Sequence, residues 1–307
     1  SREGVHTRVS SGSRLTATKT TQIPVLGLNQ KPLMPTTASR ARRWIKSGKA
    51  TPFWSHGVFC VQLNTNVGAV VQPVACGIDP GIKKEGLTVK SAAHTFLNIQ
   101  ADAVTWVKKA VAVRRDVRHN RRKRNTPRRS SRFNRGRGCL APSTKARWGW
   151  KLRLAVWLAK LYPIVQFVVE DIKVKVRPGK RRWNVSFSPL EHGKNWFYTE
   201  LGKIAPVILK RGWETEQLRG SFGLTKSSHK MAEVFKAHCV DAWVLANSWT
   251  GGHLQPDNTR LFCVTPLRFH RRQLHVIQPA KGGIRKLYGG TRSLGFKRGA
   301  IVKHPNY

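Results

Sequence analysis

Apolar residues gather in short runs in the middle of the chain, and turn-forming residues separate the runs. The pattern predicts three consecutive strands, at residues 74–78, 86–90 and 93–99. Pro80 and Gly81 mark the turn after the first of these strands. We therefore expect a meander of three neighbouring strands.

A helical pattern follows the three strands. Trp150, Leu154 and Leu158 recur one turn apart, which predicts a helix over residues 143–161. The next elements expected are a strand at 164–169, a helix at 196–211, a short strand at 213–218 and a helix at 226–247. Three strands and then helix, strand, helix, strand, helix is the element order of a ribonuclease H-like α/β fold, in which the first and fourth strands are neighbours.

Smaller units flank this pattern on both sides. In the first, residues 29–35 predict a turn, and Thr36 or Thr37 is expected to cap a short helix that ends at Gly48. Two strands should follow, at 50–54 and 58–63. Near the C-terminus, short glycine-punctuated strands at 260–265, 273–277 and 299–302 predict a β-rich basic lobe.

These elements predict a chain of seven segments. They are a disordered basic tail at 1–21, an N-terminal α+β module at 22–66, a first segment of the central fold at 67–103, an arginine-rich helix at 104–140, a second segment at 141–182, a third at 183–250 and a C-terminal basic β-domain at 251–307.

Charge narrows the choice of partner. The chain has 57 Lys and Arg residues against 14 Asp and Glu residues, a net charge of +43. Such an excess implies a polyanion bound over a large surface, with an affinity that falls as salt rises. A membrane surface is the competing partner, but no run of 18 apolar residues occurs. Nucleic acid is therefore favoured.

The five cysteines are widely spaced and form no C-x-x-C pair, which indicates neither a disulfide framework nor a zinc site. The first 21 residues lack the apolar segment of a secretory signal. We expect a protein of a reducing cytoplasm.

Basic side chains are densest in residues 108–137, where Pro127 breaks a helical pattern. Like charges packed so closely repel one another unless phosphates lie between them. The candidate nucleic-acid-binding residues of the whole chain are Lys31, Arg40, Arg42, Arg43, Arg114, Arg115, Arg118, Arg121, Arg122, Arg124, Arg128, Arg129, Arg132, Arg271, Arg272 and Arg285.

In so basic a chain, the few carboxylates at the ends of apolar runs stand out. Asp79 ends the first central strand, Glu170 follows the fourth strand, and Asp241 lies in the last apolar helix, three residues after His238. Because the first and fourth strands are neighbours in the expected fold, Asp79 and Glu170 should meet. Hard divalent cations prefer such oxygen ligands, so we expect Asp79, Glu170 and Asp241 to form a metal site.

Five motifs in this order resemble the IscB family of transposon-encoded, RNA-guided nucleases. They are Lys31-Pro32-Leu33-Met34-Pro35 before a basic helix, Gly77-Ile78-Asp79-Pro80-Gly81, the arginine helix, Val168-Val169-Glu170-Asp171, and His238-Cys239-Val240-Asp241-Ala242. The resemblance covers residues 23–250 and implies a RuvC-type nuclease divided into three sequence segments, with the arginine segment as its bridge helix.

The resemblance also implies roles and partners. Asp79, Glu170 and Asp241 would hold two Mg²⁺ ions, with Mn²⁺ as an alternative, and His238 would activate or orient the attacking water. The partners would be a long structured guide RNA and double-stranded target DNA with a short adjacent motif read near the C-terminal domain. The protein is expected to be a monomer within a ribonucleoprotein.

One departure from the IscB pattern changes the expected product. IscB carries an HNH nuclease domain between its second and third RuvC segments, but here only 67 residues, 171–237, lie between Glu170 and His238. The chain thus resembles IsrB, the branch without HNH, and a nick in the displaced, non-target strand is expected. Two alternatives stay open: an unguided structure-selective nuclease of resolvase type, and a non-catalytic RNA-binding protein of ribosomal type.

Overall fold

The computed structural model describes residues 5–8, 22–66, 68, 71–125, 140–173, 188–267, 292–293, 296–297 and 300. The chain divides into two compact units, Thr7–Thr265 and a smaller one of Ser1–His6 with Pro266–Tyr307. The strand β1 (Val5–Arg8) lies where the chain passes between the units, and β12 (Arg292–Ser293) pairs antiparallel with β13 (Phe296–Lys297). Within the described ranges, no helix combines the length and the apolar character that crossing a membrane requires.

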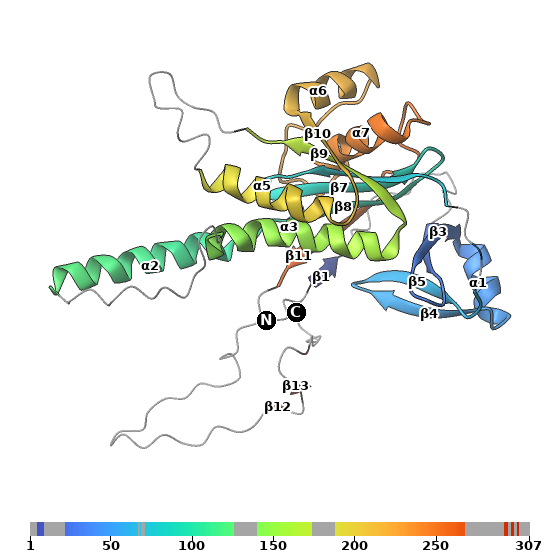
Figure 1. Cartoon of the computed structure of the whole chain (residues 1–307), viewed down its shortest axis with the longest axis horizontal. Coiled ribbons are helices and arrows are strands. Elements are labelled where there is room, and N and C mark those ends of the chain that lie inside the picture. Colours follow the sequence, from blue (N-terminus) through green and yellow to red (C-terminus); the bar gives the residue numbers. More distant parts are fainter. Residues whose placement is uncertain are drawn as a thin grey trace. The chain divides into compact units, whose positions relative to one another are not determined.

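A mixed sheet forms the centre of the larger unit (Figure 1). Its strands are β6 (Val74–Asp79), β7 (Lys84–Ser91), β8 (Thr95–Asp102), β9 (Ile164–Asp171), β10 (Val207–Arg211) and β11 (Leu261–Pro266). The order across the sheet is β11, β8, β7, β6, β9, β10. The pairs β6–β7 and β7–β8 are antiparallel, whereas β6–β9, β9–β10 and β8–β11 are parallel. An antiparallel meander with parallel strands added beside its first strand is the ribonuclease H-like fold that the sequence predicted.

Helices lie on both sides of this sheet (Figure 1). They are α3 (Pro142–Leu161), α5 (Pro189–Gly202), α6 (Gly212–Ser221) and α7 (Cys239–Thr250), whereas α2 (Trp106–Lys123) contacts α3 and extends away from the sheet (Figure 1). All residues of β6 and β7 are buried, as strands covered on both faces must be. The helix α7 packs on β6 and β7, and α3 packs against α5. Trp150, Leu154 and Leu158 of α3 are buried, so the predicted helical stripe belongs to the core.

The N-terminal elements form a second sheet with one helix. They are β2 (Gln22–Leu26), β3 (Pro32–Thr37), α1 (Ala38–Lys46), β4 (Ala50–Ser55) and β5 (Val58–Leu63), with the strand order β3, β2, β5, β4. The Thr37 hydroxyl caps α1 by accepting a hydrogen bond from the Arg40 amide, as predicted. The prediction of a turn throughout residues 29–35 was wrong, because Pro32 and Pro35 lie in β3. An edge strand tolerates prolines, since a missing amide on its outer side breaks no ladder.

The sequence was misinterpreted between residues 188 and 238. The predicted strand at 213–218 is the helix α6, and the fifth strand is β10 before it. The Glu214 side chain accepts a hydrogen bond from the Arg211 amide at 2.6 Å, which caps α6 in a way the strand interpretation ignored. The predicted helix at 196–211 begins earlier, at Pro189, and ends at Gly202; its N-cap is Ser188, whose hydroxyl accepts a hydrogen bond from the Glu191 amide.

Two further expectations need correction. The helix expected at 226–247 begins only at Cys239, and His238 is its N-cap residue. The strand expected at 260–265 in a separate β-lobe is β11, which pairs with β8 and extends the central sheet. Strands expected at 273–277 and 299–302 lie outside the described residues, apart from position 300.

Candidate metal site

The three predicted carboxylates converge at one edge of the central sheet. Asp79 is the last residue of β6, and its neighbour Ile78 pairs with Val169 of the parallel strand β9. Glu170 follows Val169, so the Asp79 and Glu170 side chains lie at the ends of adjacent strands. Asp241 lies in the first turn of α7, which packs on β6.

Close packing of α7 on the sheet brings Asp241 to this edge. A Cβ atom added to Gly77 would lie 1.8 Å from the carbonyl oxygen of Ala242, and one added to Gly86 would lie 2.4 Å from the carbonyl oxygen of His238. Only glycine fits at these two positions. Because Gly77 and Gly86 have no side chains, the start of α7 can pack directly against β6 and β7.

The site concentrates negative charge in a poorly solvated place. Asp79 is 8% exposed and Asp241 is 1% exposed. Burial, together with the nearby Asp79 and Asp241 carboxylates, raises the pKa of Glu170 to about 7 against the opposing effect of Lys226 and Arg219. Repulsion of this kind is relieved when a cation binds between the carboxylates.

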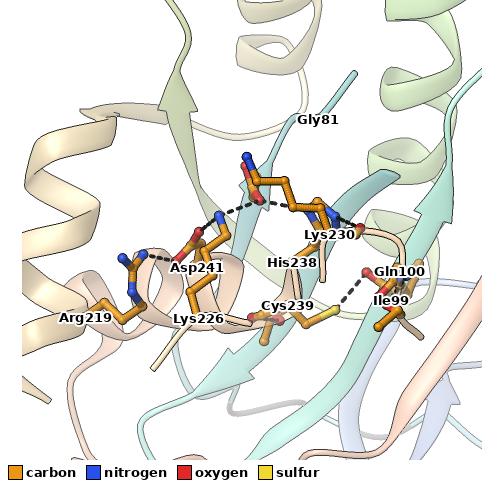
Figure 2. Close-up of polar contacts among 12 residues, drawn as sticks. Gly81, Ile99, Gln100, Arg219, Lys226, Lys230, His238, Cys239 and Asp241 are labelled. Carbon is orange, nitrogen blue, oxygen red and sulfur yellow. Dashed lines mark hydrogen bonds and ion pairs between the residues drawn. The ribbon is translucent and has the colours of Figure 1, made fainter. Parts of the chain in front are cut away.

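Two basic side chains already contact these carboxylates (Figure 2). Arg219 Nη1 of α6 donates to Asp241 Oδ1 at 2.6 Å, and Lys226 Nζ donates to Asp241 Oδ2. Lys226 Nζ also lies 3.9 Å from Asp79 Oδ2. The carboxylates Asp79 and Asp241 thus share one ammonium group.

His238 presents an unpaired nitrogen to Asp79. Its Nε2 lies 2.8 Å from the carbonyl oxygen of Lys230, so this nitrogen must carry the hydrogen and donate it (Figure 2). In the neutral ring, Nδ1 then has a free lone pair. It lies 3.5 Å from Asp79 Oδ2, and it makes no hydrogen bond within the described part of the chain. A neutral His238 therefore has a lone pair on Nδ1 that can accept a proton.

The side chains of the site are of the chemical type that binds a hard divalent cation, although they do not surround a single point closely enough to coordinate one. Three carboxylates are ligands of the kind that Mg²⁺ and Mn²⁺ accept. As they stand, no three His, Cys, Asp or Glu side chains of the described residues are close enough to hold an ion together. Arg219 and Lys226 instead occupy both oxygens of Asp241.

A fourth carboxylate, Glu85, was missed by the sequence analysis. Lys151 Nζ of α3 donates to Glu85 Oε1 at 2.5 Å and to the carbonyl oxygen of Gly81 at 3.1 Å. Burial raises the pKa of Glu85, while Lys151 lowers it. Gly81 belongs to the turn directly after Asp79, so this buried pair fastens that turn to α3. The position of Glu85 at the start of an apolar strand is the feature of the sequence that could have identified it.

Arg219 and Lys226 were missed for different reasons. Arg219 directly follows the segment interpreted as a strand, 213–218, which concealed that its side chain reaches Asp241 from α6. Lys226 is one of 57 basic residues, and nothing in the sequence distinguishes it from the others.

Most of the candidate nucleic-acid-binding residues that the structure describes are exposed. Before β3 this is Lys31, on α1 these are Arg40, Arg42 and Arg43, and on α2 and its C-cap they are Arg114, Arg115, Arg118, Arg122 and Arg124. Arg121 is half-buried. Arg128, Arg129, Arg132, Arg271, Arg272 and Arg285 lie outside the described residues.

Comparison with known proteins gives one family and several weak structural likenesses. A family model described as RRXRR protein matches residues 23–182. No curated protein sequence matches the chain. The structure of Thermus thermophilus RuvC with a Holliday junction substrate is 13% identical and covers 59% of this chain and 98% of its own, with a TM-score of 0.33.

Two other solved structures are similar to a comparable degree. Thermus thermophilus RuvC alone is 14% identical over 56% of this chain and 90% of its own, with a TM-score of 0.27. The yeast mitochondrial Holliday junction resolvase is 14% identical over 59% of this chain and 80% of its own, with a TM-score of 0.28. Since these scores are low, the fold assignment rests on the strand order.

Proposed function

The chain belongs to the RRXRR protein family, and we propose that it is a metal-dependent nuclease of RuvC type that nicks DNA under the direction of a guide RNA. The convergence of Asp79, Glu170 and Asp241 beside His238 carries this proposal. The RRXRR domain occurs in nucleases of IscB type, which supports the same assignment.

Each side chain of the site has a chemical role in this proposal. Asp79, Glu170 and Asp241 would hold two Mg²⁺ ions, or Mn²⁺ in their place. When bound, such ions lower the pKa of a water nucleophile and stabilise the leaving oxygen of a phosphodiester. The Nδ1 atom of His238 would accept a proton from the attacking water, while Nε2–H continues to donate to the Lys230 carbonyl oxygen and keeps the ring in place.

The basic surfaces support a nucleic-acid partner. The exposed arginines of α2 and α1 present charge that phosphates can neutralise, and a net charge of +43 exceeds what a single short contact with DNA needs. We assign α2 to a structured guide RNA. The DNA partner is a double-stranded target with an adjacent motif, and its sequence is read by pairing with the guide.

A single carboxylate site favours cutting of one strand. The guide-paired strand is held in a heteroduplex, whereas the displaced strand is single-stranded and can enter a basic groove without further melting. We therefore assign the displaced strand as the substrate of Asp79, Glu170 and Asp241.

The test compares the wild type with Asp79→Ala and Glu170→Ala, each with Mg²⁺ and either with or without the co-purified RNA. Wild-type protein with RNA should nick a matched plasmid, and both variants should lose nicking while they still bind RNA and DNA. Cutting of a four-way junction without RNA would instead assign the chain to the resolvase class. RNA binding with no cutting in any metal would make it a non-catalytic RNA-binding protein.

A further inference from the structure

Lys226 occupies the place between two of the carboxylates. Its ammonium group donates to Asp241 Oδ2 (Figure 2). The same group lies 3.9 Å from Asp79 Oδ2. The Lys226 side chain is 30% exposed, whereas that of Asp241 is 2% exposed. A single positive charge, reached from solvent, therefore holds two largely buried carboxylates together.

Arg219 binds the same carboxylate in a different manner. It donates to Asp241 Oδ1, on the other side of the carboxylate, and its own side chain is 16% exposed. Arg219 lies within the helix α6, whereas Lys226 lies in the non-helical segment between α6 and α7. Both oxygens of Asp241 are thus occupied, and Lys226 is the more accessible of the two partners.

We propose that Lys226 competes with a divalent cation for Asp79 and Asp241 and thereby sets the metal affinity of this site. The inference rests on the proposed function, because it takes these carboxylates as metal ligands. An ammonium ion and a divalent cation cannot contact Asp241 Oδ2 from the same side, so metal binding displaces Lys226. Arg219 can stay, because it leaves Oδ2 free.

Two opposite effects follow from this competition. In the metal-free protein, the positive charge of Lys226 offsets the repulsion between the Asp79 and Asp241 carboxylates. Loss of that charge therefore lowers the free energy of unfolding. In the presence of metal, the same loss removes a competitor, so the ion binds more tightly. A lysine that only supported the fold would lower stability without strengthening metal binding.

The experiment measures Mn²⁺ binding by the full chain, freed of nucleic acid, with isothermal titration calorimetry and thermal unfolding. Lys226→Met removes the charge and keeps the length of the side chain, whereas Lys226→Arg keeps the charge. Lys203→Met is the matched control, because Lys203 pairs with Glu200 on the surface of α5 and lies outside the site.

We expect Lys226→Met to bind Mn²⁺ at least about fivefold more tightly than the wild type and to melt at a lower temperature without metal. Lys226→Arg and Lys203→Met should not bind more tightly. If Lys226→Met is too unstable to purify, Lys226→Gln replaces it with the same expectation.

Two failures can be distinguished. If Mn²⁺ binds the wild type and Lys226→Met binds it equally or more weakly, the competition is refuted while the metal site stands. If Mn²⁺ neither binds nor stabilises the wild type or Lys226→Met, the carboxylates are not a metal site, and the proposed function fails with them.

Discussion

At the scale of single residues, the hydrogen bonding of His238 links the geometry of the site to its proposed chemistry. His238→Gln keeps a donor toward the Lys230 carbonyl but removes the nitrogen that faces Asp79. We expect this variant to fold normally and to cut about 100-fold more slowly. Single-turnover rates, corrected for the folded fraction, provide the measurement. Wild-type rates in the folded fraction would assign His238 to the core and not to catalysis.

The charge of Lys90 should make stability depend on pH, because this side chain is fully buried in β7. Its ammonium donates to Asn247 Oδ1 at 2.6 Å, Thr250 Oγ1 at 2.7 Å and the Gly251 carbonyl at 2.8 Å, at the end of α7. Burial lowers the pKa of Lys90 from 10.5 to about 8. Between these pH values the unfolded chain holds the proton and the folded chain does not, so stability rises with pH.

The free energy of unfolding of the wild type, relative to that of Lys90→Met, should therefore increase by about 3 kcal/mol as the pH rises from 8 to 10.5. Denaturant titrations at several pH values measure this difference, in which the titration of other groups cancels. A constant difference would mean that the hydrogen bonds to Lys90 fully offset its burial.

At the scale of secondary-structure elements, the contact of α7 with β6 determines where Asp241 lies. Gly77→Ala would place a Cβ atom 1.8 Å from the Ala242 carbonyl, so α7 must move away from the sheet. We expect a loss of about 2 kcal/mol or more in the free energy of unfolding, together with weaker binding of Mn²⁺.

Gly202→Ala is the matched control, because no atom lies within 4 Å of the added Cβ at that helical position. It should be neutral or slightly stabilising. An equally stable Gly77→Ala protein would show that the position of α7 is adjustable.

The central elements were predictable where the pattern had one interpretation. Long apolar runs gave the meander and β9, and the regular stripe of Trp150, Leu154 and Leu158 gave α3. Between residues 188 and 238 the failures came from short segments in which capping decided the outcome: Glu214 made a helix of a segment interpreted as a strand. Residues 226–238 resembled a helix in composition, but His238 serves as the N-cap of α7.

The candidate site was predictable in the same limited sense. Strand order brings Asp79 and Glu170 together, and the sequence alone implied that order. The basic partners of Asp241 depend on how α6 and the following segment fold back, which the sequence pattern did not reveal. Lys226 is one of 57 basic residues, and only its contacts with Asp79 and Asp241 in the folded protein distinguish it from the others.

At the scale of the whole molecule, the excess of positive charge should determine how the protein holds its guide. Contacts to phosphate carry no sequence information. Replacing Arg118, Arg121 and Arg122 of α2 by Gln should weaken the binding of different guide RNAs to a similar degree. It should also reduce the slope of log affinity against log salt by about two. Guide affinity across a salt series measures both effects, and an unchanged slope would place α2 away from the RNA.

The most direct test of the account is the strand that the intact ribonucleoprotein cuts. A supercoiled plasmid with a guide-matched target, incubated with Mg²⁺, should become open-circular, and sequencing of the ends should place the nick on the strand that does not pair with the guide. Asp79→Ala should leave the plasmid supercoiled. A linear product from one binding event, a nick in the guide-paired strand, or undiminished nicking by Asp79→Ala would contradict the assignment of Asp79, Glu170 and Asp241 as a single-strand nuclease site.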